Sequence, residues 1–207
     1  IPSTINPDRD LADLGEALGM DGPPRVMECF DISNITSTPI VASMVRFKAG
    51  LPDRSNYRKY RIKTVQGQDD FASMAEVVRR RYSQVLRDGS REAKPDELSQ
   101  ETTHEQAKRR GVALPDLIIV DGGRGQLSSA CRELQRLGLH ELPIIGLAKE
   151  FEEIYRPARP LPLRLPADSG ALKLLQRIRD EAHRFANNYH SLLLKKRMSE
   201  SLLDEIP

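Results

Sequence analysis

The stretch LIIVDGG, residues 117–123, is a short apolar run that ends in an aspartate and a glycine turn. An earlier stretch, VMECFD at residues 26–31, ends in an aspartate in the same way. Both runs are typical of buried strands, and a carboxylate at the end of such a strand is costly unless a positive charge compensates it. A divalent cation is the natural candidate because hard cations take oxygen ligands. The two strand ends therefore predict a metal site that contains Asp31 and Asp121.

The residues that follow the first stretch predict an antiparallel sheet. Three strands, over 26–31, 40–47 and 60–65, are joined by short turn-rich links, as in a three-strand meander. The apolar spacing then becomes helical. The Asp69-Asp70 pair caps this helix, and Asp88-Gly89 ends it.

The second half of the chain predicts parallel strands. A strand over 117–121, a helix over 126–137 and a strand over 143–148 follow one another, and this order predicts parallel pairing. A proline-punctuated hairpin over 154–165 comes next. A long final helix begins after Asp168-Ser169 and ends near residue 198. The fold class is therefore α/β, a mixed sheet whose meander comes first and whose parallel strands come second, with helices on both faces.

The length and composition allow one substantial core, because the chain has 207 residues and is 39% hydrophobic. We expect a polar lead-in with one short helix over 1–22 and one domain over 23–200. A polar stretch over 89–112 predicts a mobile loop within this domain. Residues 201–207 are expected to begin a linker. Because the sequence starts without an initiator methionine, it is interpreted as a piece of a longer protein.

Charge and cysteine content exclude several classes of protein. The formal charge is only +2, from 32 basic and 30 acidic residues, so it does not by itself indicate a nucleic-acid binder. No apolar stretch approaches the roughly 20 residues that cross a membrane, and no signal peptide is visible. We therefore expect a cytoplasmic protein without membrane contact. Cys29 and Cys131 are too few for a disulfide framework or a zinc finger, and are predicted to be reduced buried thiols.

Further side chains are candidates for the predicted metal site, each with a structural alternative. Asp70, at a predicted helix start, is either a cap or a ligand. His183, on the final helix, is either a packing residue or a group that binds the ion or accepts a proton from the attacking water. Glu76, Glu181 and His190 are weaker candidates for a supporting role around the site.

Basic residues and glycines could serve a phosphate-bearing substrate. Local basic clusters occur at 79–81, 108–110 and 195–197, and these either contact phosphates or form solvated surfaces. The glycines of the GGRG turn at 122–125 either permit a tight strand-to-helix turn or leave space for a metal and a phosphate. A metal-activated water, charge relief on the transition state and nearby cations are what phosphodiester hydrolysis requires.

Several blocks, in order along the chain, resemble UvrC, the incision subunit of bacterial nucleotide-excision repair. They are ECFDIS at 28–33, VASM at 41–44, YRKY at 57–60, DDFASM at 69–74, RRRY at 79–82, PDLIIVDGGRGQL at 115–127, GLAK at 146–149 and LLQRIRDEAHRFA at 174–186.

The resemblance implies the C-terminal endonuclease half of UvrC, with an RNase H-like fold over residues 23–200, which cuts damaged double-stranded DNA on the 5′ side of a lesion. It also implies catalytic roles for four residues, namely Asp31, Asp70, Asp121 and His183. Asp31 and Asp121 are expected to hold Mg²⁺ or Mn²⁺, and His183 to complete the site or manage the proton of the water. The side chains expected to contact DNA are Arg79, Arg80, Arg81, Arg124 and Lys149.

The chain also departs from the family pattern. Family members commonly have a histidine where this chain has Asn34. The family's N-terminal nuclease module, its segment that binds the partner subunit UvrB and its C-terminal helix-hairpin-helix module are missing. We therefore expect this piece to bind DNA weakly by itself. Separately, we expect a monomer. Two other functions remain possible: a non-catalytic nucleic-acid-binding or scaffold domain on this fold, and an RNase H-like enzyme acting on RNA or hybrids, since nothing here reads a 2′-hydroxyl.

Overall fold

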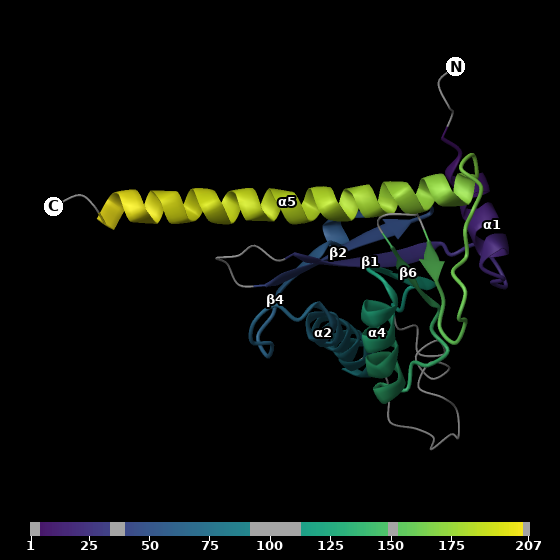
Figure 1. Cartoon of the computed structure of the whole chain (residues 1–207), viewed down its shortest axis with the longest axis horizontal. Helices are drawn as coiled ribbons and strands as arrows, with labels where there is room; N and C mark the ends of the chain where they lie inside the picture. Colours follow the sequence, from purple (N-terminus) through teal and green to yellow (C-terminus); the bar gives the residue numbers. More distant parts are fainter. Residues whose placement is uncertain (1–4, 34–39, 92–112, 149–152, 205–207) are drawn as a thin grey trace.

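The computed structural model describes residues 5–33, 40–91, 113–148 and 153–204, and a seven-stranded mixed sheet lies at its centre (Figure 1). In chain order, the elements are α1 (Pro7–Ala17), β1 (Val26–Ser33), β2 (Val41–Lys48), β3 (Leu51–Pro52), the 3₁₀ turn η1 (Arg54–Asn56), β4 (Arg58–Arg61), α2 (Asp70–Arg91), β5 (Leu117–Asp121), α4 (Arg124–Arg136), β6 (Ile144–Leu147), β7 (Ile154–Tyr155) and α5 (Gly170–Asp204).

The sheet has both kinds of pairing that the sequence predicts. The strand order is β3-β2-β1-β5-β6-β7, and β4 also pairs with β2. Strand β2 runs antiparallel to both β1 and β4, which confirms the meander. Strand β5 lies parallel to β1 on one side and to β6 on the other. The first and second halves of the chain therefore meet at the β1–β5 pair.

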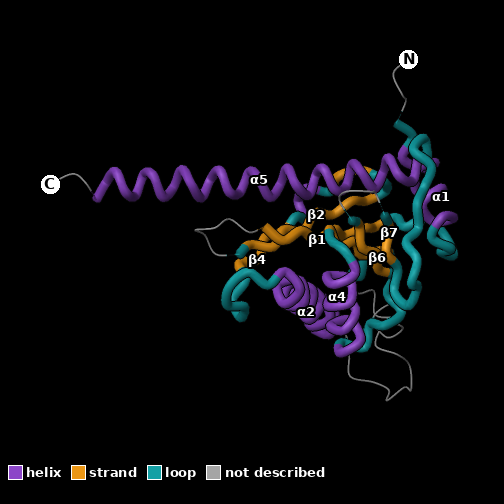
Figure 2. The backbone as a smooth tube through the Cα atoms, in the orientation of Figure 1, coloured by secondary structure: helices purple, strands orange, loops and turns teal. Residues whose placement is uncertain are grey.

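Each face of the sheet has its own hydrophobic core. Helices α2 and α4 cover one face, where Phe30 and Val120 are buried, and α1 and α5 cover the other, where Cys29 and Ile119 are buried (Figure 2). Because successive side chains of a strand point to opposite faces, the odd-numbered residues of β1 and β5 point toward α5. This alternation determines which helix Asp31 and Asp121 can meet.

The third strand is shorter than predicted, because β4 ends at Arg61 rather than Val65. The reason is Glu76 of α2, whose carboxylate accepts hydrogen bonds from the backbone N–H groups of Lys63 at 3.0 Å and Thr64 at 2.6 Å. These groups are therefore unavailable to a strand ladder. Glu76, a weaker candidate for the site, instead ends this strand.

Helix α2 confirms the predicted cap but continues further than predicted. Asp69 Oδ1 accepts from the N–H of Ala72 at 3.0 Å, which places the cap at the first aspartate of the pair. The helix then passes through Gly89 to Arg91, whereas the sequence predicted an end at 88–89. A single glycine costs a helix only about 1 kcal/mol, which the packing of α2 on the sheet outweighs.

Helix α1 lies in the predicted lead-in segment but belongs to the core. Leu11 and Leu14 are fully buried between α1, α5 and the sheet. Asp10 of α1 also pairs with Arg177 of α5 at 2.8 Å. The predicted hairpin over 154–165 is reduced to the two-residue β7 and one antiparallel bridge between Ile154 and Leu163. In the described part of the chain, no helix is long and apolar enough to span a membrane.

Candidate metal centre

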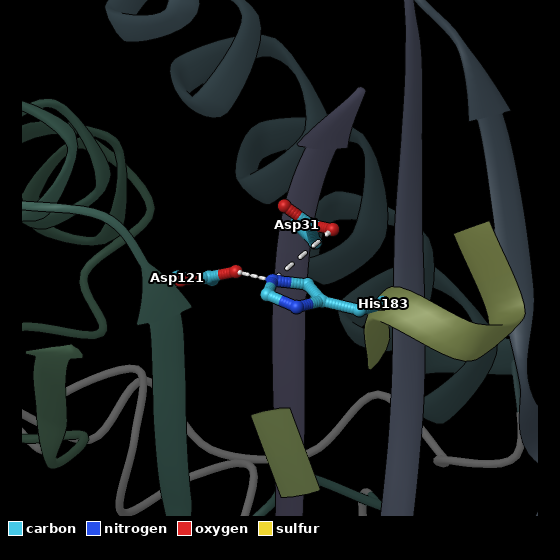
Figure 3. A group of neighbouring side chains, drawn as sticks. All are labelled: Asp31, Asp121 and His183. Carbon is cyan, nitrogen blue, oxygen red and sulfur yellow. Dashed lines mark hydrogen bonds and ion pairs between the residues drawn. The ribbon is translucent and has the colours of Figure 1, made fainter. Parts of the chain in front are cut away.

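The two predicted strand-end carboxylates lie on neighbouring strands. The parallel register pairs Phe30 with Val120, so Asp31 and Asp121 are the next residues on β1 and β5. Both follow the alternation that points their side chains toward α5. His183 reaches them from α5, so three segments that are far apart in the sequence meet at one point (Figure 3).

The three side chains are close enough to bind one cation. His183 Nε2 lies 2.5 Å from Asp121 Oδ2 and 4.0 Å from Asp31 Oδ2. One ligand atom from each residue lies within 4.8 Å of the other two. With its proton on Nδ1, the imidazole presents the Nε2 lone pair to both carboxylates; with the proton on Nε2, it donates to Asp121.

Burial makes this arrangement costly without a positive charge. Asp31 and Asp121 are each only 6% exposed. Asp121 Oδ1 is buried and has no hydrogen-bond partner among the described residues. An unpartnered carboxylate oxygen is rare in a protein interior, because no hydrogen bond offsets the free-energy cost of removing it from water. Two carboxylates and an imidazole are all metal-ligating groups, so Asp31, Asp121 and His183 could together hold a metal ion.

The helix that carries His183 is fixed to the sheet by aromatic and polar contacts. Small residues, Ala182 and Ala186, are buried against the sheet. The Tyr57 hydroxyl donates to Glu181 at 2.9 Å, and the Tyr57 and Phe185 rings pack in a T-shaped arrangement with centroids 5.0 Å apart. Partial burial and the bond to Glu181 raise the pKa of Tyr57, so the hydroxyl remains a donor. Glu181, a weaker candidate for the site, thus anchors α5.

Cys29 lies on the same face of β1, two residues before Asp31. Burial raises the pKa of its thiol, and the negative charges of Asp121 and Asp31 raise it further. The thiolate is the nucleophilic form, so Cys29 is held in its unreactive state. Both cysteines are free; Cys29 is buried and Cys131 half-buried.

Asp70 does not belong to the group of ligand atoms formed by the other three predicted residues. It is the first residue of α2 and is half-buried. Its neighbour Phe71 lies against Gly125, where an added Cβ would come within 2.2 Å of the ring. Gly125 follows Asp121 by four residues and lies in the first turn of α4, so this contact ties the start of α2 to the start of α4. The glycine lets the Phe71 ring lie directly against the first turn of α4.

The predicted DNA contacts differ in their surroundings. Arg79 is exposed, whereas Arg80 donates to the carbonyl of Arg61 at 2.7 Å and Arg81 pairs with the buried Glu28 at 2.8 Å. The Arg81 pair is a structural contact on the α2 face of the sheet, and a DNA contact by Arg81 stays a prediction. Arg124 lies over the Tyr155 ring and donates to the carbonyl of Pro160. Lys149, Asn34 and the side chain of His190 lie outside the described residues.

The sequence is similar to curated bacterial and archaeal proteins. It is 48% identical over 197 residues to the UvrABC system protein C of Dehalococcoides mccartyi, covering 95% of this chain and 30% of that protein. It is 49% identical over 190 residues to the UvrABC system protein C of Methanospirillum hungatei, covering 92% of this chain and 32% of that protein. The chain therefore spans about a third of the length of these relatives.

Among solved structures, the chain is similar to Endonuclease V of Ciona intestinalis in complex with a 24-residue DNA containing an inosine followed by a ribo-adenosine. The TM-score is 0.37 at 15% identity, covering 76% of this chain and 56% of that one. Human ENDOV matches with a TM-score of 0.30. Likeness at this level carries no argument about function.

The mixed sheet with helices on both faces, and the strand-end carboxylates beside a helix-borne histidine, occur in a chain that matches a family of RNase H endonuclease domains. The model of the UvrC RNase H endonuclease domain family matches residues 15–187. The chain belongs to this family.

Proposed function

We propose that this chain is the DNA-cleaving domain of a UvrC-type protein and makes the 5′ incision beside a lesion, using Mg²⁺ or Mn²⁺. The observation that carries the proposal is the convergence of Asp31, Asp121 and His183, with the buried Asp121 Oδ1 lacking any partner among the described residues. The curated relatives are proteins of the UvrABC system, which supports a role in nucleotide-excision repair.

The chain's own residues would bind and orient the ion. Asp31 and Asp121 are fixed by adjacent strands, so their carboxylates need little reorganisation when a cation binds. His183 completes the ligand set from α5. The bound metal supplies an activated water and stabilises charge on the phosphate oxygens. Asp70, at the start of α2, is proposed to assist catalysis from beside the centre rather than from within the ligand group.

The substrate and partners follow from the family and are part of the proposal. Damaged double-stranded DNA is the proposed substrate, and the UvrB subunit is the proposed partner of the longer protein. The domain itself is proposed to act as a monomer in the cytoplasm.

Nicking of a supercoiled plasmid in Mn²⁺ tests the activity. The parent protein is compared with Asp31→Asn, Asp121→Asn and His183→Ala, and with the control Asp168→Asn, which neutralises an exposed carboxylate before α5. We expect nicking by the parent and the control, and a loss of at least about 100-fold in the three site variants.

Two results would contradict the proposal. Equal nicking by the parent and the site variants would identify a contaminant. Tight Mn²⁺ binding without any nicking, on damaged or supercoiled DNA, would favour a non-catalytic nucleic-acid-binding domain.

A further inference from the structure

A groove lies between helix α4 and the segment that leaves β7. Its volume is about 580 Å³. One wall is a single face of α4, with Arg124, Leu127, Cys131 and Arg132 at helical spacing. The other wall is residues 155–160.

Four arginines line the groove, namely Arg124, Arg132, Arg156 and Arg159, and no acidic side chain lines it. Within the described chain, none of the four has a carboxylate at ion-pair distance. Arg132 donates only to the Ser129 hydroxyl, at 3.3 Å. Arg156 Nε is buried without a hydrogen-bond partner among the described residues. Arginines gathered around a cavity in this way repel one another unless an anion occupies the space.

The backbone builds this arrangement. Residues 156–159 form a turn in which the N–H of Arg159 donates to the carbonyl of Arg156 at 3.4 Å, with Ala158 in the left-handed region at φ 58°. The turn carries Arg156 and Arg159 toward α4. Gly123, at the N-cap of α4, contributes no side-chain cap, so the positive end of the helix dipole adds to the field at that end of the groove.

One end of the groove follows closely after Asp121 along the chain. Arg124 opens α4 three residues after Asp121, and its guanidinium reaches Pro160 on the opposite wall. Tyr155, under Arg124, and Leu127 provide apolar surface between the guanidinium groups. Planar guanidinium groups match phosphate oxygens, and apolar walls suit sugars and bases.

We propose that this groove binds the sugar-phosphate backbone of the DNA strand that enters the metal centre. The inference rests on the proposed function, because it takes the substrate to be DNA. The proposal adds Arg132, Arg156 and Arg159 to the substrate-binding surface. Their contacts would be to phosphates and would therefore not depend on the base sequence.

The test measures how binding depends on salt. A fluorescent DNA duplex is bound in EDTA, where metal-dependent cleavage is blocked, over a series of NaCl concentrations. The logarithm of the DNA-binding constant falls linearly with the logarithm of the salt concentration. Each lost phosphate contact makes this negative slope shallower by about one. We therefore expect the slope to become shallower by about one in Arg132→Gln and in Arg159→Gln, and by about two in the double variant.

Arg136→Gln is the matched control, because Arg136 lies on the same helix but pairs with Glu133 at 2.9 Å outside the groove. It removes the same charge and is expected to leave the slope unchanged. In nicking assays, the groove variants are expected to raise KM several-fold without lowering kcat. If Arg132→Gln and Arg159→Gln retain the parent slope, or match Arg136→Gln, the groove does not bind the backbone.

A measurement on the parent protein removes any dependence on variant folding. Cys131 lines the groove and is half-buried, whereas Cys29 is fully buried. Bound DNA is expected to slow the labelling of Cys131 by a maleimide several-fold. An unchanged labelling rate would overturn the inference. The two proposals can fail separately. If the parent protein does not nick DNA, but the salt dependence changes in the groove variants and DNA slows the labelling of Cys131, then the proposed function fails while the groove still binds DNA.

Discussion

The Tyr82 hydroxyl donates to Glu28 Oε1 at 2.9 Å in the core between β1 and α2, where both residues are fully buried. Glu28 also pairs with Arg81 at 2.8 Å and Arg46 at 3.4 Å. The Glu28 carboxylate thus pairs with two arginines and accepts a hydrogen bond from a hydroxyl, on the face of β1 opposite Asp31. Burial and the negative charge of Glu28 raise the pKa of Tyr82, which keeps this hydroxyl protonated as a donor.

Glu28→Ala is expected to destabilise the protein by about 3–5 kcal/mol, because removing one partner leaves buried charges uncompensated. Urea denaturation measures the change. Glu200→Ala is the control, since Glu200 pairs with Lys196 at 3.8 Å on the exposed part of α5. It should change stability by less than about 0.5 kcal/mol. An equal loss of stability in both variants would show that the buried ion pairs of Glu28 stabilise the protein no more than an exposed pair does.

Mn²⁺ is expected to raise the melting temperature through Asp31, Asp121 and His183. At about 100 times its Kd, a ligand of the native state adds about 2.7 kcal/mol. For a chain of this size that corresponds to a rise of about 5–10 °C. EDTA should reverse the shift in differential scanning fluorimetry. Asp121→Asn should abolish it and Asp168→Asn should retain it; an equal shift in both would place the ion elsewhere.

Gly125→Ala is expected to cost about 1–3 kcal/mol, since the added methyl group would overlap the Phe71 ring. The same substitution in a Phe71→Ala background should be neutral or stabilising, because alanine is the better helix former. A double-mutant cycle in urea measures this coupling. Additive effects would mean that the ring moves aside freely. Nicking should also fall in Gly125→Ala, because the contact joins the start of α2 to the start of α4, which follows Asp121.

The carboxylate of Glu76 is expected to stabilise the protein in a pH-dependent way. Burial opposes its charged form, but hydrogen bonds from Thr64, Lys63 and Arg80 outweigh this and hold its pKa below the ordinary value of 4.5. A lowered folded-state pKa gives stability that is present above the unfolded pKa and is lost as pH falls through the folded value.

Glu76→Gln should therefore be less stable than the parent at neutral pH, and the difference should shrink below about pH 4. Urea denaturation at several pH values measures the difference. A constant difference down to low pH would show that hydrogen-bond geometry matters and charge does not.

The sheet and the proximity of Asp31 to Asp121 could be predicted from the sequence because both depend on local patterns. A run of apolar residues that ends in aspartate identifies β1 and β5, and period two places Asp31 and Asp121 on one face. His183 could be predicted only as a candidate, because its distance from Asp31 and Asp121 depends on how α5 packs on the sheet. The resemblance to a family indicated that Asp31, Asp121 and His183 belong to one site.

Other features depend on contacts between distant residues and leave no local signal. The early end of β4 depends on Glu76, which lies on another element, and the burial of α1 depends on α5. The arginine groove joins α4 to a segment whose sequence shows only prolines and arginines. The ion pair between Arg81 and the buried Glu28 could not be predicted, because a charge on a helix does not reveal a partner on another element.

Helix α5 is continuous from Gly170 to Asp204 and extends well past the edge of the sheet (Figure 1). From His183 to Asp204 it covers on the order of 30 Å along its axis. Because the helix is continuous, a tilt or turn of its C-terminal part is transmitted along the axis to the turn that carries His183. The orientation of this helix and the occupancy of the ion are therefore thermodynamically linked, and each biases the other by the same free energy.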